Sequence, residues 1–299
     1  MKLAASMAYL NYYFNNEEAF AKLRRIGYRN ADIALGGKRL FSSDENEWKT
    51  AVDGIAENAA KHGIKIVQAH SPNSNPVDDS RKEKEFFYAT RSLEICERLG
   101  IKDLVVHAGY DSDLGKTEWY EKNRDFYRLL FPFMEKAEVN VLTENTTKNN
   151  LSRGFYLYTG ADMVEFIEYV DHPLFNAVWD TGHGTSEGCQ YDNVVALGKY
   201  LRGLHVHDNN GKADEHGIPY TGVLNLDSLI CGLMDIGYKG YFTFETLNAL
   251  RRSKGRTTRM TFERDKRLLE PTAEMAVAAE NLVYTIGKCA LEAYGIFEE

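Results

Sequence analysis

The sequence predicts an α/β fold, a closed (β/α)8 TIM barrel that spans residues 1–299 as one domain and ends in a C-terminal helix. Short runs rich in Val, Ile and Ala alternate with longer segments whose apolar residues have helical spacing. This alternation repeats eight times in 299 residues, slightly more than the roughly 250 residues typical of such barrels. Several predicted helices also end at a glycine directly before the next strand, at Gly27, Gly63, Gly100 and Gly237.

The first strand is predicted in the segment MKLAASMAYLNYY. Its apolar run is short, ends at polar Asn11 and has no clear cleavage site, so it indicates a strand rather than a secretory signal. In the first half of the chain the predicted strands and their following helices are 2–8 with 17–28, 30–35 with 45–64, 65–71 with 81–101, and 102–109 with 118–139.

The second half repeats the pattern. Its predicted pairs are 140–146 with 161–172, 176–184 with 193–201, 202–209 with 226–238, and 240–248 with 272–296. Alternating strands and helices predict a parallel sheet. An open doubly wound sheet is the alternative, but it usually has a Gly-rich phosphate loop after its first strand, and this sequence has none there. No linker or shift in composition divides the chain.

Composition narrows the class of protein. The formal net charge of −8 argues against broad attraction to nucleic acid or to an anionic membrane. No apolar stretch approaches the roughly 20 residues that a membrane span needs. The four cysteines are far apart and form no CxxC pair, which indicates reduced thiols in a cytoplasmic protein. Assembly into a homo-oligomer is compatible with the sequence.

Residues that can bind a metal gather at the predicted strand ends. In a barrel of this class the carboxyl ends of the strands meet at one mouth, where the chemistry takes place. Residues 203–217, GLHVHDNNGKADEHG, are especially rich in such side chains, which Zn²⁺ and Mn²⁺ commonly use as ligands. The candidates at strand ends and in the loop after the seventh strand are His70, His107, Glu144, Asp180, His183, His205, His207, Asp214, His216 and Glu245.

Three acids carry the strongest signal for a cation. Glu144, Asp180 and Glu245 each stand in an apolar strand, where a carboxylate is costly to bury unless it meets a cation or hydrogen-bond donors. One cation would satisfy all three. His205 would be the fourth ligand, because strand alternation points His205 and His207 inward and their neighbours outward. Taken singly, His70 or His107 is more often an ordinary buried histidine.

These residues resemble the xylose-isomerase-like TIM barrels, a superfamily that includes ketose 3-epimerases, inosose isomerases and dehydratases, and endonuclease IV. The resemblance covers nearly the whole chain and rests on TEN at Glu144, WDTGH at Asp180, HVHDNNGKADEH at His205 and FET at Glu245. In the epimerase and isomerase branch it implies one divalent metal, Zn²⁺, Mn²⁺ or a similar ion, held by Glu144, Asp180, His205 and Glu245. The two glutamates also act there as acid and base.

Endonuclease IV is the alternative that the resemblance offers. That enzyme holds three zinc ions, and its additional ligand types have counterparts in His70, His107, His183, Asp214 and His216. The chain departs from both branches. Glu215 stands where the nuclease pattern has Arg, TGV at 221–223 replaces its Gly-x-Gly, and Gly211 stands where ketose epimerases carry Arg.

We therefore expect a metal-dependent isomerase or epimerase of a sugar, or of a sugar-like polyol or inosose, that transfers a proton next to a carbonyl. Glu144 and Glu245 are the expected catalytic residues. The expected substrate-binding residues are His70, His107, His183, His207, Asp214 and His216. The alternatives are a zinc phosphodiesterase that acts on abasic DNA and a noncatalytic sugar-binding barrel.

A basic segment over residues 251–267 follows the last predicted strand. It could bind a phosphate or carboxylate of a small substrate, or the backbone of DNA. A solvated or subunit-contacting loop is the other interpretation. The resemblance implies a small-molecule sugar as the partner, and the acidic net charge of the chain argues against nucleic acid.

Overall fold

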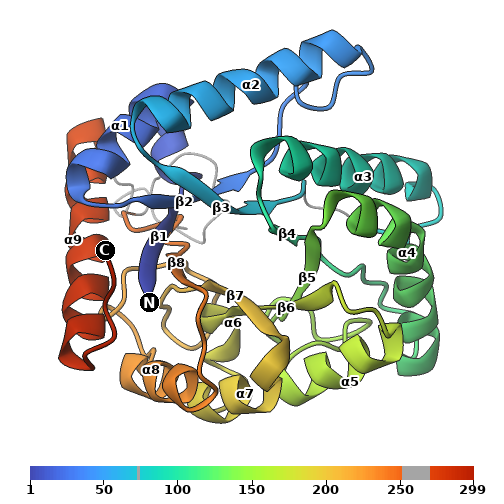
Figure 1. Ribbon diagram of the computed structural model, residues 1–299. Coiled ribbons are helices and arrows are strands. Elements are labelled where there is room, and N and C mark those ends of the chain that lie inside the picture. Colours follow the sequence, from blue (N-terminus) through green and yellow to red (C-terminus); the bar gives the residue numbers. More distant parts are fainter. Residues whose placement is uncertain (73–74, 251–269) are drawn as a thin grey trace, which may run out of the picture.

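Eight parallel strands stand at the centre of the computed structural model, which describes residues 1–72, 75–250 and 270–299, and helices surround them (Figure 1). The strands are β1 Lys2–Ser6, β2 Asn30–Ala34, β3 Lys65–His70, β4 Asp103–Val105, β5 Asn140–Glu144, β6 Phe175–Asp180, β7 Leu201–His205 and β8 Tyr241–Phe244. Each predicted strand is present, so the predicted (β/α)8 barrel is confirmed.

The strands pair in chain order, and β1 also pairs with β8. The remaining seam, between β7 and β8, consists of one bridge that joins Val206 to Phe244. Its hydrogen bonds run from the Val206 amide to the Thr243 carbonyl (2.8 Å) and from the Glu245 amide to the Val206 carbonyl (3.1 Å). The ring of strands is therefore closed, but its last seam is the shortest.

The helices that follow the strands are α1 Asn16–Ile26, α2 Glu45–Lys61, α3 Lys82–Leu99, α4 Lys116–Ala137, α5 Gly160–Val170, α7 Gln190–Leu197, α8 Leu226–Asp235 and α9 Ala273–Ala293. Shorter elements are η1 Leu10–Tyr12, η2 Gly198–Tyr200 and the four-residue helix α6 Thr181–Gly184. Helix α6 was not predicted, and the helix predicted over residues 193–201 begins three residues later than α7 does. Gly198 ends α7 earlier than predicted, with a positive φ of 48°.

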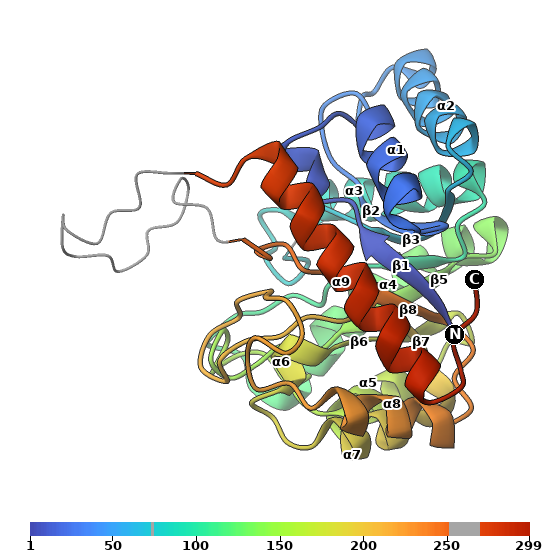
Figure 2. The same ribbon diagram turned by 90° about the vertical axis from the view of Figure 1, so that its left-hand side faces the viewer.

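The C-terminal helix α9 brings the end of the chain next to its beginning. It runs obliquely across the outside of the barrel, and both termini lie at the same end of the molecule (Figure 2). The Met1 amino group contacts the Ile296 carbonyl and pairs with Glu298 Oε1 at 3.0 Å. This end is opposite the mouth, because β1 begins there.

The side chains inside the barrel form an apolar layer below a polar one. Val105, Leu142 and Val178, on β4, β5 and β6, make a small buried cluster of their own. Leu204 and Val206 belong instead to the large core between strands and helices, as the alternation in the sequence predicts. Glu144 lies two residues beyond Leu142 and so on the same side of β5. On the side of β4, β5 and β6 the candidate site therefore rests on an apolar floor.

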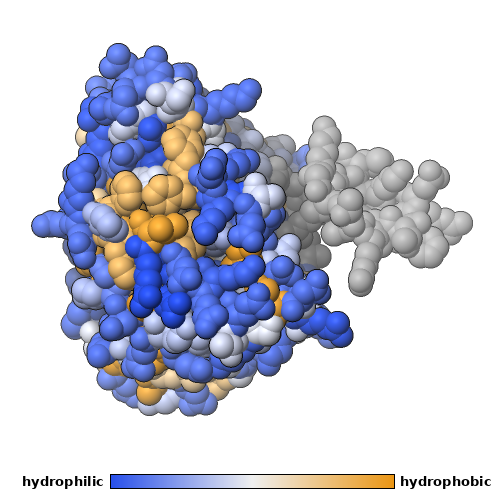
Figure 3. All heavy atoms as spheres, turned by 90° about the vertical axis from the view of Figure 1, so that its right-hand side faces the viewer, coloured by the Kyte–Doolittle hydropathy of each residue, from blue (hydrophilic) through white to orange (hydrophobic). Residues whose placement is uncertain are grey.

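The outer surface also carries apolar side chains on the side of α3 and α4. Figure 3 shows apolar atoms gathered on that face of the molecule. On these helices Leu129 is 46% exposed, and the ring of Phe86 meets that of Phe133 edge to face. Among the helices that the structure describes, none combines the length and apolar character of a bilayer span.

Candidate metal centre at the barrel mouth

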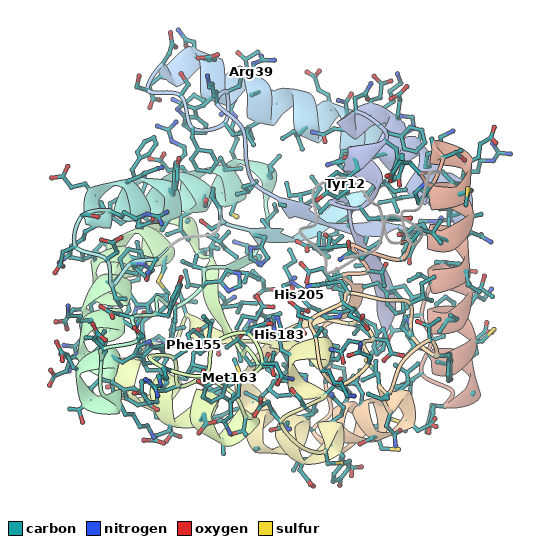
Figure 4. The ribbon with its side chains drawn as sticks, turned by 180° about the vertical axis from the view of Figure 1, so that it is seen from behind. Tyr12, Arg39, Phe155, Met163, His183 and His205 are labelled. Carbon is teal, nitrogen blue, oxygen red and sulfur yellow. The ribbon has the colours of Figure 1, made fainter. Side chains whose placement is uncertain are left out.

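The ends of four strands bring the predicted metal ligands together. Glu144 ends β5, Asp180 ends β6, His205 ends β7, and Glu245 follows β8 directly. One ligand atom from each lies within 4.8 Å of those of the other three, and all four residues are buried. In the view from behind, His205 and His183 lie near the middle of the ring of helices (Figure 4). The grouping is as expected from the sequence, while the role of these residues as ligands stays a prediction.

Glu144 is the centre of this polar layer. Its Oε1 lies 3.0 Å from His205 Nδ1, and its Oε2 lies 3.5 Å from both His70 Nε2 and His107 Nε2. Oε2 is buried and has no hydrogen-bond partner among the described residues. Burial alone would raise the pKa of Glu144, but the charge of His205 and its hydrogen bond to Glu144 outweigh burial and hold that pKa well below its usual value. An ionised, unpartnered carboxylate oxygen fits a cation.

Asp180 is fixed by its neighbours on both sides. Its Oδ1 accepts a hydrogen bond of 2.7 Å from the His183 amide and so caps α6, and its Oδ2 lies 2.9 Å from His207 Nε2. Asn145 bonds the backbone of Asp180 in both directions, at 2.7 and 3.0 Å. These contacts set the position of the carboxylate before any ligand binds.

A second group of ligand-type side chains lies beside the first. Asp214 is 3.2 Å from His183 Nε2 and 3.1 Å from His216 Nε2, and single ligand atoms of the three residues lie within 4.8 Å of one another. His216 is also tied to β8 through its Nδ1, which lies 3.0 Å from the Glu245 carbonyl oxygen. The loop after β7 thus returns to the mouth, as the run at 203–217 suggested.

Charges in this second group favour protonated imidazoles when no cation is present. Burial alone would lower the pKa of His183, but Asp180 and Asp214 raise it to about 10. For His216, Asp214 and Glu245 likewise outweigh burial and raise the pKa to about 9. The opposite holds for His107, because burial lowers its pKa to about 4.

His207 is more deeply placed than the other predicted substrate-binding residues. Its side chain is fully buried, its ring stacks on that of His216 at 3.8 Å, and its Nε2 faces Asp180. Its Nδ1 has no hydrogen-bond partner among the described residues. His207 therefore contacts two other candidates directly, while its contact with a substrate stays a prediction.

Asp208 belongs to the ligand-rich run but holds the loop together. Its Oδ1 accepts hydrogen bonds of 2.8 Å from the amides of Asn209 and Leu224, and its Oδ2 accepts one of 2.9 Å from the Gly222 amide. The Asp208 backbone also pairs with Gly217. Three backbone donors occupy this carboxylate, so it shapes the loop that carries Asp214 and His216.

Two buried polar residues of the site were not predicted from the sequence. Asp32, on β2, is 1% exposed, and Gln68, on β3, is 3% exposed. Gln68 Nε2 lies 2.8 Å from His205 Nε2, and Asp32 Oδ2 lies 3.9 Å from the same nitrogen. The signal was available for Asp32, since it is an acid in an apolar strand like Glu144. The basic segment 251–267, by contrast, falls outside the described residues.

Most of the chain is similar in sequence to a known protein family. A family model described as xylose isomerase-like TIM barrel matches residues 20–266. A probable endonuclease 4 of Geobacter sulfurreducens is 23% identical over 225 residues, which cover 67% of this chain and 75% of that protein. A fructoselysine 3-epimerase of Escherichia coli O157:H7 is 37% identical over 73 residues, which cover 24% of this chain and 26% of the relative.

Among solved structures, a D-tagatose 3-epimerase-like protein superimposes with a TM-score of 0.73 and 19% identity, covering 99% of this chain and 100% of the other. At this level of identity the match supports the fold.

Proposed function

The chain belongs to the xylose isomerase-like TIM barrel family, and from this premise we propose that it is a divalent-metal-dependent epimerase or isomerase of a sugar, or of a sugar-like polyol or inosose. The observation that carries the proposal is the convergence of Glu144, Asp180, His205 and Glu245 within 4.8 Å. The similarity to a fructoselysine 3-epimerase over 73 residues and the fold shared with a D-tagatose 3-epimerase-like protein support it.

The donor set fits a first-row divalent cation. Three carboxylates and one imidazole are ligands that Zn²⁺ and Mn²⁺ accept. The unpartnered Oε2 of Glu144 supplies the specific fit, because a buried carboxylate oxygen without a donor is costly. Glu144, Asp180, His205 and Glu245 would hold the ion. The four free cysteines support the further proposal of a reducing, cytoplasmic setting.

A cation bound there supplies Lewis acidity toward a carbonyl and its neighbouring hydroxyl, which makes hydrogen on the adjacent carbon acidic. Glu144 and Glu245 then act as the base and the acid. One carboxylate takes the proton from carbon as the bonding electron pair moves toward the carbonyl oxygen. The other carboxyl delivers a proton to carbon on the opposite face, and the configuration of that carbon is inverted.

The remaining polar side chains would orient the sugar. With its pKa lowered to about 4, His107 is neutral at pH 7 and can both donate and accept a hydrogen bond. His70, also beside Glu144, offers a second imidazole toward the same side. The charged group of His183, Asp214 and His216 can bind hydroxyls from the other side. These substrate-binding roles are proposals, as are the metal-binding roles of the four ligands.

The test is hydrogen exchange at carbon. The metal-loaded protein is incubated in D₂O with free and phosphorylated ketoses, aldoses and inososes, and deuterium next to the carbonyl is followed by NMR or mass spectrometry. An accepted sugar should take up deuterium. Glu144→Gln and Glu245→Gln should each slow exchange by roughly 10²- to 10⁴-fold, the usual contribution of a general base. Glu138→Gln, at an exposed helix end, is the matched control and should exchange at the wild-type rate.

Bound metal is measured in every variant, because loss of a ligand could also slow exchange. Slower exchange at equal metal content supports the acid and base roles. Unchanged exchange in both glutamine variants would remove the two glutamates from catalysis. Turnover without any exchange would indicate hydride transfer instead.

A zinc phosphodiesterase is the second candidate, and a specific observation favours it. The group of His183, Asp214 and His216 could hold a further cation beside the first, and His70 and His107 face the free oxygen of Glu144. Clustered zinc ions can generate hydroxide and stabilise a leaving alkoxide. Metal counting and incubation with DNA that contains an abasic site separate the candidates. Three bound zinc ions together with nicking would overturn the sugar proposal.

A further inference from the structure

The two nitrogens of His205 face different surroundings. Nδ1 points to the acids of the mouth, at 3.0 Å from Glu144 Oε1 and 3.8 Å from Glu245 Oε2. Nε2 points to the polar side chains below, at 2.8 Å from Gln68 Nε2 and 3.9 Å from Asp32 Oδ2. The ring is fully buried. Only Nδ1 is therefore directed at the position where the four candidate ligands converge.

The contact with Gln68 involves the ring nitrogen that faces away from the acids of the mouth. Gln68 Nε2 lies 2.8 Å from His205 Nε2, and this pair is a hydrogen bond only in the tautomer whose Nε2 accepts from the amide NH₂ group. A cation on Nδ1 needs the lone pair of that nitrogen. The metal-bound ring therefore has the second tautomer, with its proton on Nε2, and Nε2 becomes a donor.

Asp32 is the acceptor that this second tautomer requires. It is 1% exposed, and its Oδ1 has no hydrogen-bond partner among the described residues. Its Oδ2 already lies 3.9 Å from His205 Nε2. A carboxylate that is buried beside an imidazole and has an unused oxygen gains a donor when Nε2 carries the proton.

Gly203 keeps the amide of Gln68 in reach of the ring. A Cβ atom at residue 203 would collide with Gln68 Oε1 and would also approach Leu142 and Val178. The missing side chain therefore leaves the space in which the amide lies. If the amide turns about its last bond, it presents Oε1 to Nε2 in place of the NH₂ group and becomes an acceptor for the second tautomer.

We propose that Asp32 and Gln68 are positioning residues that stabilise the Nε2-protonated tautomer of His205 and thereby hold Nδ1 ready for a divalent cation. Metal-bound histidines commonly donate their other ring N–H to a carboxylate or carbonyl, and loss of that partner typically weakens metal binding by about 10- to 100-fold. This inference rests on the metal site of the proposed function, and it concerns metal affinity rather than the sugar.

The test compares isosteric variants by Zn²⁺ and Mn²⁺ affinity, measured by competition with a chelator of known affinity. Asp32→Asn and Gln68→Met should each bind metal about 10- to 100-fold more weakly than wild type, and Asp32→Glu should recover part of the loss. Asp103→Asn is the matched control. Asp103 is also a strand aspartate, but it is on β4 and pairs with Arg202 at 2.8 Å, so its variant should keep the wild-type affinity.

A spectroscopic measurement on wild type addresses the tautomer without a variant. Protein labelled with ¹⁵N-histidine is compared with and without Zn²⁺, and His205 is assigned from the signals missing in His205→Asn. In the zinc form the His205 proton should be on Nε2 and should exchange slowly with water. In Asp32→Asn that Nε2 proton should exchange faster.

Two results would overturn the inference: coordination through Nε2, or wild-type metal affinity in both Asp32→Asn and Gln68→Met. Sugar exchange is measured separately. A protein that behaves as described here but exchanges no sugar hydrogen would contradict the proposed function alone.

Discussion

Replacing Glu144 should disturb more side chains at the barrel mouth than replacing any other residue of the candidate site. Its two oxygens contact His205, His70 and His107, so they connect the four-residue candidate site with the pair of histidines from β3 and the loop after β4. Glu245 lies next to His205 and His216 instead. The two proposed catalytic glutamates therefore have different neighbours, and substitutions of the two need not give the same loss.

Protons compete with metal at single histidines, which gives a prediction about pH. With pKa values raised to about 10 and about 9, His183 and His216 carry protons at pH 7 in the metal-free protein. If the group of His183, Asp214 and His216 holds a further cation, as the zinc phosphodiesterase candidate requires, that cation must displace those protons, so its affinity should rise as the pH rises toward these values and fall in acid. Zinc affinity measured from pH 6 to pH 9 checks this.

The control is His172→Gln, which changes a histidine that stacks on Phe131 away from the site. It should keep the slope of affinity against pH, whereas His183→Gln should reduce that slope. A wild-type affinity that is independent of pH would contradict the prediction.

Part of the site could be predicted from the type of single residues and their place in the predicted strands. Glu144, Asp180 and Glu245 could be found because an acid in an apolar strand needs a partner. Asp32 gives the same signal, yet no motif draws attention to it, and the polar contact of Gln68 depends on Gly203, which is remote in the sequence. Asp208 is the converse case. It looks like a ligand, but three amides of its own loop occupy it.

At the scale of elements, α6 shows how a short helix can serve the site without a helical sequence. Its four residues, TGHG, include two glycines, which disfavour helix. The turn forms because Asp180 caps it through the His183 amide and because Gly182 lets the chain pass close to His207. A Cβ atom at 182 would collide with the His207 ring.

Gly182→Ala should therefore lower the free energy of unfolding by roughly 1–3 kcal/mol, the usual cost of overpacking, and should weaken metal binding by moving His207 off Asp180. Urea denaturation and metal titration measure the two effects. Gly54→Ala is the matched control. Gly54 is in α2 and a Cβ there meets nothing within 4 Å, so alanine should stabilise the protein by roughly 0.5–1 kcal/mol. Equal effects of the two substitutions would contradict the role of Gly182.

Element boundaries were predicted unevenly. Helix ends marked by glycine agree well, because Gly100 at the end of α3 adopts the left-handed conformation that only glycine takes up easily. The strand expected over residues 202–209 is β7, Leu201–His205, and it is shorter because Asp208 pairs with Gly217 in the following loop. A pairing of that kind, within the following loop, leaves no periodic pattern in the strand itself.

At the scale of the molecule, α9 buries an acid that has no part in the proposed mechanism. Glu280 is 1% exposed, and burial raises its pKa from 4.5 to about 7. Because the pKa is higher in the folded state, this group favours the fold fully below about pH 4.5, and the contribution is lost as the pH rises to about 7. Glu280→Gln should remove that part of the pH dependence.

The measurement is the free energy of unfolding at pH 5 and at pH 8. The decrease between these pH values should be smaller in Glu280→Gln than in wild type by roughly 2–3 kcal/mol. Glu274→Gln, an exposed position in the same helix, should retain the wild-type decrease. An unchanged decrease in Glu280→Gln would mean that Glu280 does not ionise in this range.

The number of strand and helix pairs was enough to predict the architecture, since eight such pairs of this length close into a barrel. The way in which the ring closes was not predictable. The pairing of Val206 with Phe244 joins residues that are far apart in the chain, and each has an ordinary strand sequence around it.

That closing bridge has a consequence for cooperativity. Val206 and Phe244 are the neighbours in sequence of His205 and Glu245, so two of the four candidate metal ligands flank the shortest seam, His205 at the end of β7 and Glu245 directly after β8. A cation that binds both side chains would link β7 to β8 directly. Part of its binding free energy would then oppose local opening of the barrel wall. Metal binding and the stability of the seam between β7 and β8 would therefore be thermodynamically linked.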